Sequence, residues 1–381
     1  MTQYFNYAEL NWLEVAQLPR DTPLVLPLVE DFAPERLSEA LSHPTLVGVL
    51  PRLPFGWMGS LLPVPEKILT ALVINLLDSL RDDGFTRVYA ILPHDLNLGL
   101  GAQAITVPAS NLNLGSALQN INPRGKVLIA PIGHTEQHGH HLPLSTDTLI
   151  IDAIAAGITK ANPENAVRLP VMPYGVSTHR PSFAGTLNSG GRAFEDFWGA
   201  IIDQLVWRGF EHLYLISGHG GNSSFLVNIV KYAGERHRRI FCATAWLYLS
   251  GPAGIASLEQ HRRSPIGGMG HACELETSLI LHLRPDLVRM DRVVDELDFV
   301  STPAYFMDWV EGGALVANPP WDDDTATGAY GAGSLATAKH GAIWLQAAID
   351  EKNIHVMEIL EQQARREARR TSGFGLWGLS N

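Results

Sequence analysis

The feature that most constrains the fold of this chain is its alternation of short apolar segments with amphipathic segments. Residues 126–132 are apolar and predict a buried strand, and residues 148–160 place several isoleucines on one side of a predicted helix. Another helix is predicted at 192–208, followed by a strand at 212–217. Alternation of this kind is typical of an α/β fold in which helices cover both faces of a mainly parallel sheet.

Composition argues against several classes of protein. Of the 381 residues, 46% are hydrophobic, which is enough for a substantial core. The 28 Lys and Arg against 39 Asp and Glu give a net charge of −11, which argues against binding to nucleic acid or to a membrane surface. Cys242 and Cys273 cannot form a disulfide framework, and neither a secretory signal nor a membrane-spanning apolar run is recognisable. We therefore expect a cytoplasmic globular protein.

The chain contains an internal repeat. Residues 82–97 and 207–222 share Gly, Phe, Tyr, Ile, His and Asn at equivalent positions. Residues 50–56 and 169–175 share a Leu-Pro-x-x-Pro-aromatic-Gly pattern. The matches keep their order along the chain, which favours a duplicated domain over two unrelated strand–helix–strand units.

The repeat predicts three regions. Residues 1–115 form a shortened, degenerate copy without a metal site, residues 116–350 form the catalytic copy, and residues 351–381 form a C-terminal helix and tail. Residues 98–125, which are rich in Gly, Asn and Ser, are predicted to be the linker between the copies.

Glu136, His138 and Asp147 follow a predicted strand within a few residues. Glu136 and His138 are two residues apart in extended chain, so their side chains project from one face. Asp147 lies where the next helix begins. Carboxylates and imidazoles at this density are typical ligands of Zn²⁺ or Mn²⁺. The alternative for Glu136 is a solvated loop carboxylate, and His140 and His141 are interpreted as loop histidines rather than ligands.

Two further segments carry candidate residues. His219 lies in Ser-Gly-His-Gly-Gly-Asn at the carboxyl end of a strand, where open α/β sheets bind ligands. His271, Glu274 and Glu276 lie where a later helix begins, and His271 is suited to carry a proton near neutral pH. Ordinary capping by an acidic first turn is the alternative for the two glutamates. Cys273 beside them is interpreted as a packed residue rather than a nucleophile.

Together these segments resemble the creatininase (creatinine amidohydrolase) family. The matching pieces lie at residues 136–147, 174–175, 185–186, 218–222, 271–278, 327–330 and 336–341, and residues 12–15 resemble the family's usual opening. The resemblance covers about residues 126–350. It implies a three-layer α/β/α sandwich with a mainly parallel sheet, partly duplicated here.

The resemblance also implies two divalent metal ions per chain, Zn or Mn, with Fe as a further option. It assigns as metal ligands Glu136, His138, Asp147, His219 and Glu274. His271 becomes the proton shuttle and Glu276 a catalytic acid. Creatininases proper carry a carboxylate at the place of Gly221 and a tryptophan at the place of Gly267, and both departures argue against creatinine as the substrate.

The implied reaction is hydrolysis of a non-peptide C–N bond in a small molecule, a cyclic amide or a formamide. A hydroxide shared by the metal ions attacks the carbonyl carbon, and His271 delivers a proton to the leaving nitrogen. Trp207 and Trp246 are aromatic candidates near the site, although packing in the core is the favoured interpretation of both. The alternatives are a metal-dependent peptidase that trims a small modified peptide, and a non-catalytic scaffold.

The family commonly forms hexamers, so we expect a homo-oligomer, a trimer or a hexamer. In that assembly the degenerate copy takes the place of a neighbouring subunit.

Overall fold

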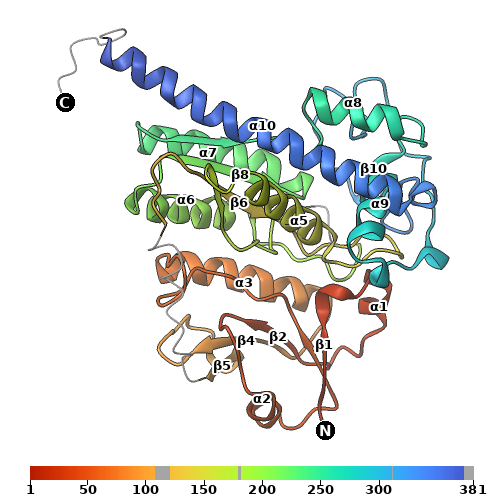
Figure 1. Ribbon diagram of the computed structural model, residues 1–381. Helices are drawn as coiled ribbons and strands as arrows, with labels where there is room; N and C mark the ends of the chain where they lie inside the picture. Colours follow the sequence, from red (N-terminus) through yellow and green to blue (C-terminus); the bar gives the residue numbers. More distant parts are fainter. Residues whose placement is uncertain (108–120, 179–181, 311, 373–381) are drawn as a thin grey trace.

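Two parallel sheets lie one above the other, with helices between them, in the computed structural model of residues 1–107, 121–178, 182–310 and 312–372 (Figure 1). The first sheet contains β1 (Gln3–Asn6), β2 (Leu24–Pro27), β3 (Leu46–Val49), β4 (Val88–Pro93) and β5 (Ala104–Val107). The second contains β6 (Val127–Ile132), β7 (Ala166–Arg168), β8 (His212–Ser217) and β9 (Phe241–Thr244). We call residues 1–107 the first unit and residues 121–372 the second unit.

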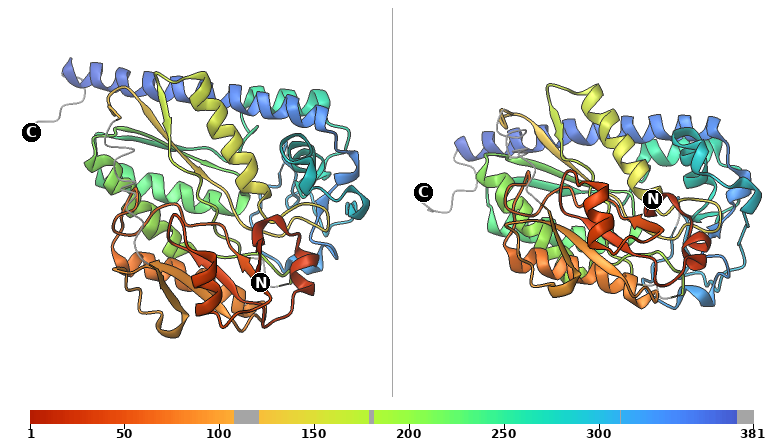
Figure 2. Two further views of the ribbon diagram at one scale, coloured as in Figure 1. Left: turned by 60° about the horizontal axis from the view of Figure 1, so that its bottom comes forward. Right: turned by 90° about the horizontal axis from the view of Figure 1, so that it is seen from below.

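Helices cover both faces of each sheet. The first unit carries α1 (Trp12–Gln17), α2 (Pro34–Ala40) and α3 (Glu66–Asp82). The second unit carries α5 (Thr146–Ala161), α6 (Gly191–Trp207), α7 (Ser223–Arg236), α8 (Pro252–His261), α9 (Glu274–Leu283) and α10 (Ala338–Thr371). A small antiparallel pair, β10 (Met269–His271) and β11 (Tyr330–Gly331), lies beside α9. In Figures 1 and 2, α10 runs along the outer side of the second unit.

Strand residues alternate between two hydrophobic layers, as the two-residue period of a strand requires. Leu128 and Ala130 face a core shared with α3 and α6, between the sheets. Val127 and Ile129 face the opposite core, which is formed with α5 and α10. On α5 the buried isoleucines recur at helical spacing, so one face of this helix packs on the sheet.

The two sheets share the order and register of four strands. The order is β3-β2-β4-β5 in the first unit and β7-β6-β8-β9 in the second, and all pairs are parallel. Val25 lies opposite Tyr89, and its counterpart Ile129 lies opposite Tyr214. The strand β1 is an addition at the edge of the first sheet.

The structure confirms the α/β sandwich and the predicted elements at 126–132, 148–160, 192–208 and 212–217. One prediction is wrong. The segment 98–125, expected to be a linker, contains β5, which pairs with β4 as the edge of the first sheet, while its residues 108–120 lie outside the described residues. The expected boundary after residue 350 falls inside the continuous helix α10. Among the described residues, no helix combines the length and apolar character needed to cross a membrane.

Candidate metal centre

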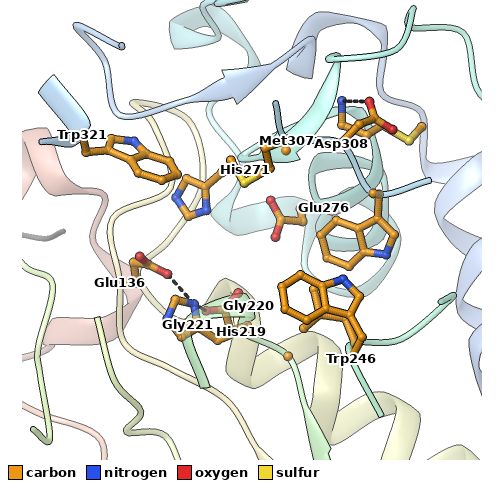
Figure 3. A pocket seen from close by; sticks show the side chains of 16 residues that line it. Glu136, His219, Gly220, Gly221, Trp246, His271, Glu276, Met307, Asp308 and Trp321 are labelled. Atoms are coloured by element: carbon orange, nitrogen blue, oxygen red, sulfur yellow. Dashed lines mark hydrogen bonds and ion pairs between the residues drawn. The ribbon is translucent and has the colours of Figure 1, made fainter. Parts of the chain in front are cut away.

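The candidate site lies at the carboxyl ends of β6 and β8. The chain leaves β6 toward β7 on one side and leaves β8 toward β9 on the other. Loops that diverge in this way open a crevice between neighbouring strand ends, the usual ligand position in open α/β sheets. Polar side chains from the loop after β6, the turn after β8 and the start of α9 meet there (Figure 3).

His138 presents one ring nitrogen to two carboxylates. Its Nδ1–H donates to Glu136 O at 3.0 Å, because a carbonyl can only accept. In the neutral ring Nε2 therefore carries the lone pair, and it lies 3.1 Å from Asp147 Oδ1 and 3.8 Å from Glu276 Oε1. This orientation of a buried imidazole is typical of a metal ligand.

His219 is arranged in the same way from the other side. Its Nε2–H donates to Val176 O at 3.0 Å. Its Nδ1 lies 2.8 Å from Glu136 Oε2 and 3.4 Å from Asp147 Oδ2. Asp147 thus faces both histidines, one through each carboxylate oxygen.

The electrostatics of these groups favour a bound cation. Burial alone would lower the pKa of His219, but the adjacent Glu136 carboxylate and Asp147 raise it to about 10. Burial alone would also lower the pKa of His138, but the adjacent Asp147 carboxylate raises that pKa well above its usual value. No hydrogen bond from a described residue satisfies His138 Nε2 or Asp147 Oδ2. Buried carboxylates facing imidazole lone pairs fit divalent metal ions.

The described residues contain three groups of side chains with ligand atoms close enough to hold a metal ion. They are His138, Asp147 and Glu276; His134, Glu136 and His219; and Glu136, His138 and His271. Four of the five predicted ligands therefore lie together, namely Glu136, His138, Asp147 and His219.

Glu274 lies elsewhere, and this differs from the prediction that it binds metal. It is fully buried, and its carboxylate accepts hydrogen bonds from Arg263 N at 3.0 Å and Ser264 N at 2.8 Å. Glu276 instead lies with His138 and Asp147. Residues two apart on a helix point in different directions, so only one of the two glutamates can face the crevice.

Close packing at Gly221 explains why no carboxylate stands there. A Cβ at this position would lie 2.4 Å from His219 Nε2 and 2.4 Å from Val176 O, the two atoms of the hydrogen bond that orients His219. A side chain at this position would therefore displace the histidine. Glu276 supplies a carboxylate from α9 instead.

His271, the predicted proton shuttle, lies beside the cluster. Its Nε2–H donates to Gln137 O at 2.7 Å, which leaves Nδ1 as the unprotonated nitrogen. Burial and the neighbouring His138 lower the pKa of His271. A neutral imidazole at the edge of the crevice can accept a proton and pass it on.

Sequence reasoning missed His134, which is fully buried beside His219 with ring centroids 4.4 Å apart. Gly175 N donates to His134 Nδ1 at 2.9 Å, so the proton lies on Nε2. Burial lowers the pKa of His134 to about 3. Although it belongs to a geometric cluster, this tautomer makes it a donor rather than a ligand. Its position two residues before Glu136, the same spacing as between Glu136 and His138, was the available signal.

The pocket over the cluster is largely apolar (Figure 3). Trp246 and Trp321 lie on opposite sides of it, and the segment 307–309 closes a third side. Trp246, which is 56% exposed, is therefore a pocket residue rather than a core residue. Trp207 is 82% exposed and does not line the pocket. Neither packs in the core as expected, and Trp321 carried no recognisable sequence signal.

Comparison with known proteins identifies the family to which this fold and site belong. The family model of creatininase (creatinine amidohydrolase) matches residues 115–352. The chain belongs to the creatininase family. Members of this family related to the chain are metal-dependent hydrolases that act on C–N bonds, so this chain is a creatininase-family hydrolase.

Two curated relatives illustrate the range of the family. The chain is 34% identical over 185 residues to a creatinine amidohydrolase of Pseudomonas putida, covering 44% of this chain and 68% of that one. It is 32% identical over 178 residues to a mycofactocin precursor peptide peptidase of Mycolicibacterium smegmatis, covering 44% and 62%.

Solved structures agree on the fold. A creatininase matches with a TM-score of 0.55 and 23% identity over 65% of this chain and 95% of that one. A mutant creatininase of the Zn-Zn type matches with a TM-score of 0.51 and 26% identity over 61% and 90%. The unmatched part of this chain leaves room for an addition to the common fold.

Proposed function

We propose that this chain hydrolyses a non-peptide C–N bond, a cyclic amide or a formamide, in a small molecule. The observation that carries this proposal is the meeting of His138, His219 and Glu276 around Asp147 at the carboxyl ends of β6 and β8. A scaffold protein has no need for such a group, because buried charges without a partner are costly.

The residues present fit two divalent ions. His138, Asp147 and Glu276 would hold one, and Glu136, Asp147 and His219 would hold the other, with Asp147 shared. The mixture of imidazole and carboxylate ligands suits Zn²⁺ or Mn²⁺, and Fe²⁺ is compatible with it. Such ions, when bound, polarise a carbonyl group and lower the pKa of water.

The side chains of the protein supply orientation and proton transfer. The carbonyls of Glu136 and Val176 hold the histidine rings so that their lone pairs face the centre. His271, held through its Nε2–H, keeps Nδ1 available to take up a proton and deliver it to the leaving nitrogen. In this assignment Glu276 is a metal ligand, and Glu274 secures the loop at residues 263–264.

The pocket favours a small, flat amide. Trp246 and Trp321 provide aromatic faces on opposite sides, and aromatic faces stack well on planar groups. None of the described residues that line the pocket is a Lys or Arg, so a substrate carboxylate finds no cationic side chain there. A peptidase is the second candidate, because one relative cleaves a precursor peptide.

We further propose that the chain is an internal duplication. The degenerate copy spans residues 1–115 and the catalytic copy begins at residue 116; the helix α10 runs continuously past residue 350, the predicted start of the C-terminal helix and tail at residues 351–381. The shared strand order and register support this division. The helices α3 and α6, which occupy equivalent positions of the repeat, also pack against each other.

Hydrogen bonds across the two units support a pseudo-two-fold relation. Gly185 N donates to Asp83 Oδ2 at 2.8 Å, and Arg208 Nη2 donates to Leu61 O at 2.9 Å. Asp83 and Arg208 are equivalent in the repeat, and Leu61 and Gly185 nearly so. Reciprocal contacts of this kind characterise an isologous interface. On this basis we infer that the first unit replaces a neighbouring subunit. The family resemblance is the ground for proposing a homo-oligomer, a trimer or a hexamer, and the composition is the ground for proposing a cytoplasmic location.

The test is elemental analysis of the purified chain combined with a screen of cyclic amides, formamides and short peptides. We expect about two equivalents of zinc or manganese per chain, together with hydrolysis that a chelator abolishes and added metal restores. The double variant Glu136→Gln/His219→Ala should lose metal and activity. About four equivalents would mean that the first unit also binds metal, and no metal after reconstitution would favour a scaffold.

A further inference from the structure

A segment between β1 and β2 of the first unit packs against the metal centre of the second unit. We call residues 7–18 the strap; they contain a 3₁₀ turn and α1. Ser145 N donates to Ala8 O at 2.9 Å, and Leu144 N donates to Leu10 O at 2.8 Å. The strap is therefore bonded to the backbone that leads into the first turn of α5.

The same stretch of backbone is held on its other side. Leu144 O accepts a hydrogen bond from Glu136 N at 3.0 Å, so Leu144 lies between the strap and the start of the metal loop. Val15 of the strap is fully buried, and its Cγ2 lies 3.3 Å from the place of a Cβ on Gly185. The path of the loop between Glu136 and Asp147 therefore depends on the strap.

Trp12 connects the strap to three loops of the second unit. Its Nε1–H donates to Thr327 O at 2.7 Å. Its ring centroid lies 5.2 Å from that of His140 and 5.2 Å from that of Phe183. One indole group therefore contacts the loops that carry Thr327, His140 and Phe183 and sets the spacing between them.

The contact with Thr327 leads to the proton-transferring histidine. The next residue, Gly328, accepts a hydrogen bond from Gln137 Nε2 at 2.9 Å through its carbonyl oxygen. A Cβ on Gly328 would lie 2.0 Å from Gln137 Oε1, so the two residues are tightly packed. The carbonyl oxygen of Gln137 in turn accepts the Nε2–H of His271 at 2.7 Å.

We propose that the strap is a positioning element of the metal centre and that Trp12 is its positioning residue. The strap fixes the loop from Glu136 to Asp147 through backbone bonds, and Trp12 fixes the Thr327–Gly328 turn, and through it Gln137 and His271. The inference rests on the proposed function, since it takes this loop to hold metal. If so, the first unit helps to position the metal centre although it contributes none of the proposed metal ligands.

Surface ion pairs do not account for this placement. Glu14 Oε1 lies 3.1 Å from Arg292 Nη1, and Glu9 Oε1 lies 3.4 Å from Arg284 Nη2. All four side chains are partly exposed, and exposed pairs contribute little to stability. The directed hydrogen bonds and the buried contacts of the strap therefore determine its position.

The test compares Trp12→Phe with Trp198→Phe in the full chain. Phenylalanine retains the ring contacts of Trp12 but removes the Nε1–H. Trp198 is buried, and its Nε1 has no hydrogen-bond partner among the described residues, so its replacement is a matched control. The measurements are hydrogen exchange of peptides covering residues 136–147 and 325–331, and the rate at which zinc-loaded protein releases Zn²⁺ to a chelator.

We expect Trp12→Phe to accelerate both exchange in these peptides and zinc release by about three- to tenfold, the effect of losing one hydrogen bond. Trp198→Phe should change neither. Faster exchange confined to residues 7–18, with zinc release equal to that of the control, would overturn the proposal. Should the unmodified chain take up none of zinc, manganese or iron, the proposed function fails, and hydrogen exchange still decides the role of the strap.

Discussion

Glu274 and Glu276 are two residues apart on α9 and have different tasks. Glu276 faces His138 at 3.8 Å, whereas Glu274 accepts two backbone N–H groups of the loop before β10. The difference follows from the helical rotation of about 200° between residues two apart. Both glutamates are buried, so burial does not distinguish their roles. The atoms that each carboxylate faces do.

Glu276→Gln should therefore remove metal, and Glu274→Gln should not. We expect Glu276→Gln to lower the metal content by about one equivalent, because an amide is a weaker ligand than a carboxylate. Glu274→Gln should keep its metal and lose about 1–3 kcal/mol of unfolding free energy. Elemental analysis and thermal unfolding separate the two effects. Metal loss in Glu274→Gln alone would restore the assignment based on resemblance.

His141 makes stability depend on pH. Burial, and then the neighbouring His138, lowers its pKa from 6.5 to about 4. The unfolded chain binds the proton below pH 6.5 while the folded chain does not, so the contribution of His141 to stability is lost as pH falls from 6.5 toward 4. The loss reaches about 1.4 kcal/mol per pH unit.

Urea unfolding at about pH 7.5 and about pH 5.5 checks this expectation. In the same metal state, His141→Gln should lose less stability between the two pH values than the unmodified chain. Equal losses in both proteins would assign the pH dependence to other groups.

The turn between β8 and α7 shows how one short element determines the position of His219, a proposed metal ligand. Gly221→Ala should displace His219, because the new Cβ would stand 2.4 Å from its Nε2 and from Val176 O. We expect loss of about one metal equivalent and a destabilisation of about 1–3 kcal/mol.

Gly199→Ala is the matched control for this substitution. Gly199 lies within α6, and a Cβ there would meet no atom within 4 Å. Alanine in a helix is favoured over glycine by up to about 1 kcal/mol, so this variant should be as stable as the original or more so. Full metal content in Gly221→Ala would show that the turn tolerates a side chain.

The two units share one core in the molecule as a whole. Phe55 of the first unit stacks on Phe197 of the second with centroids 6.1 Å apart, and both are fully buried. Tyr174 also donates from its hydroxyl to Pro51 O across the same boundary. We therefore expect the units to unfold together.

Phe55→Ala should lower the unfolding free energy by about 3–5 kcal/mol. Calorimetry should show one transition, shifted as a whole, because the interface couples both units. Val300 is 71% exposed, so Val300→Ala should shift the transition little. Two separate transitions, of which only one responds to Phe55→Ala, would mean that the units fold independently.

The sequence alone was sufficient for the class of fold, the elements around the site and most of its residues. Apolar periodicity marks β6, α5, α6 and β8, because burial of one face imposes it. The residues of the loop from 136 to 147 are close in the chain, so their meeting required no knowledge of distant packing. The place of His219 at a strand end marked it as a candidate, and the family resemblance gave it the role of a ligand.

Tertiary structure decided the rest. Which glutamate of α9 faces His138 and the crevice depends on the rotation of that helix against the sheet, which local sequence does not specify. The composition around the edge strand β5 resembles that of a linker. The segment forms a strand because it pairs with β4, a contact that its own residues do not reveal. Trp321 and Trp12 reach the site only through contacts between residues far apart in the chain, 315 positions in the case of Trp12 and Thr327. Such contacts arise from packing of the complete chain, and no local pattern encodes them.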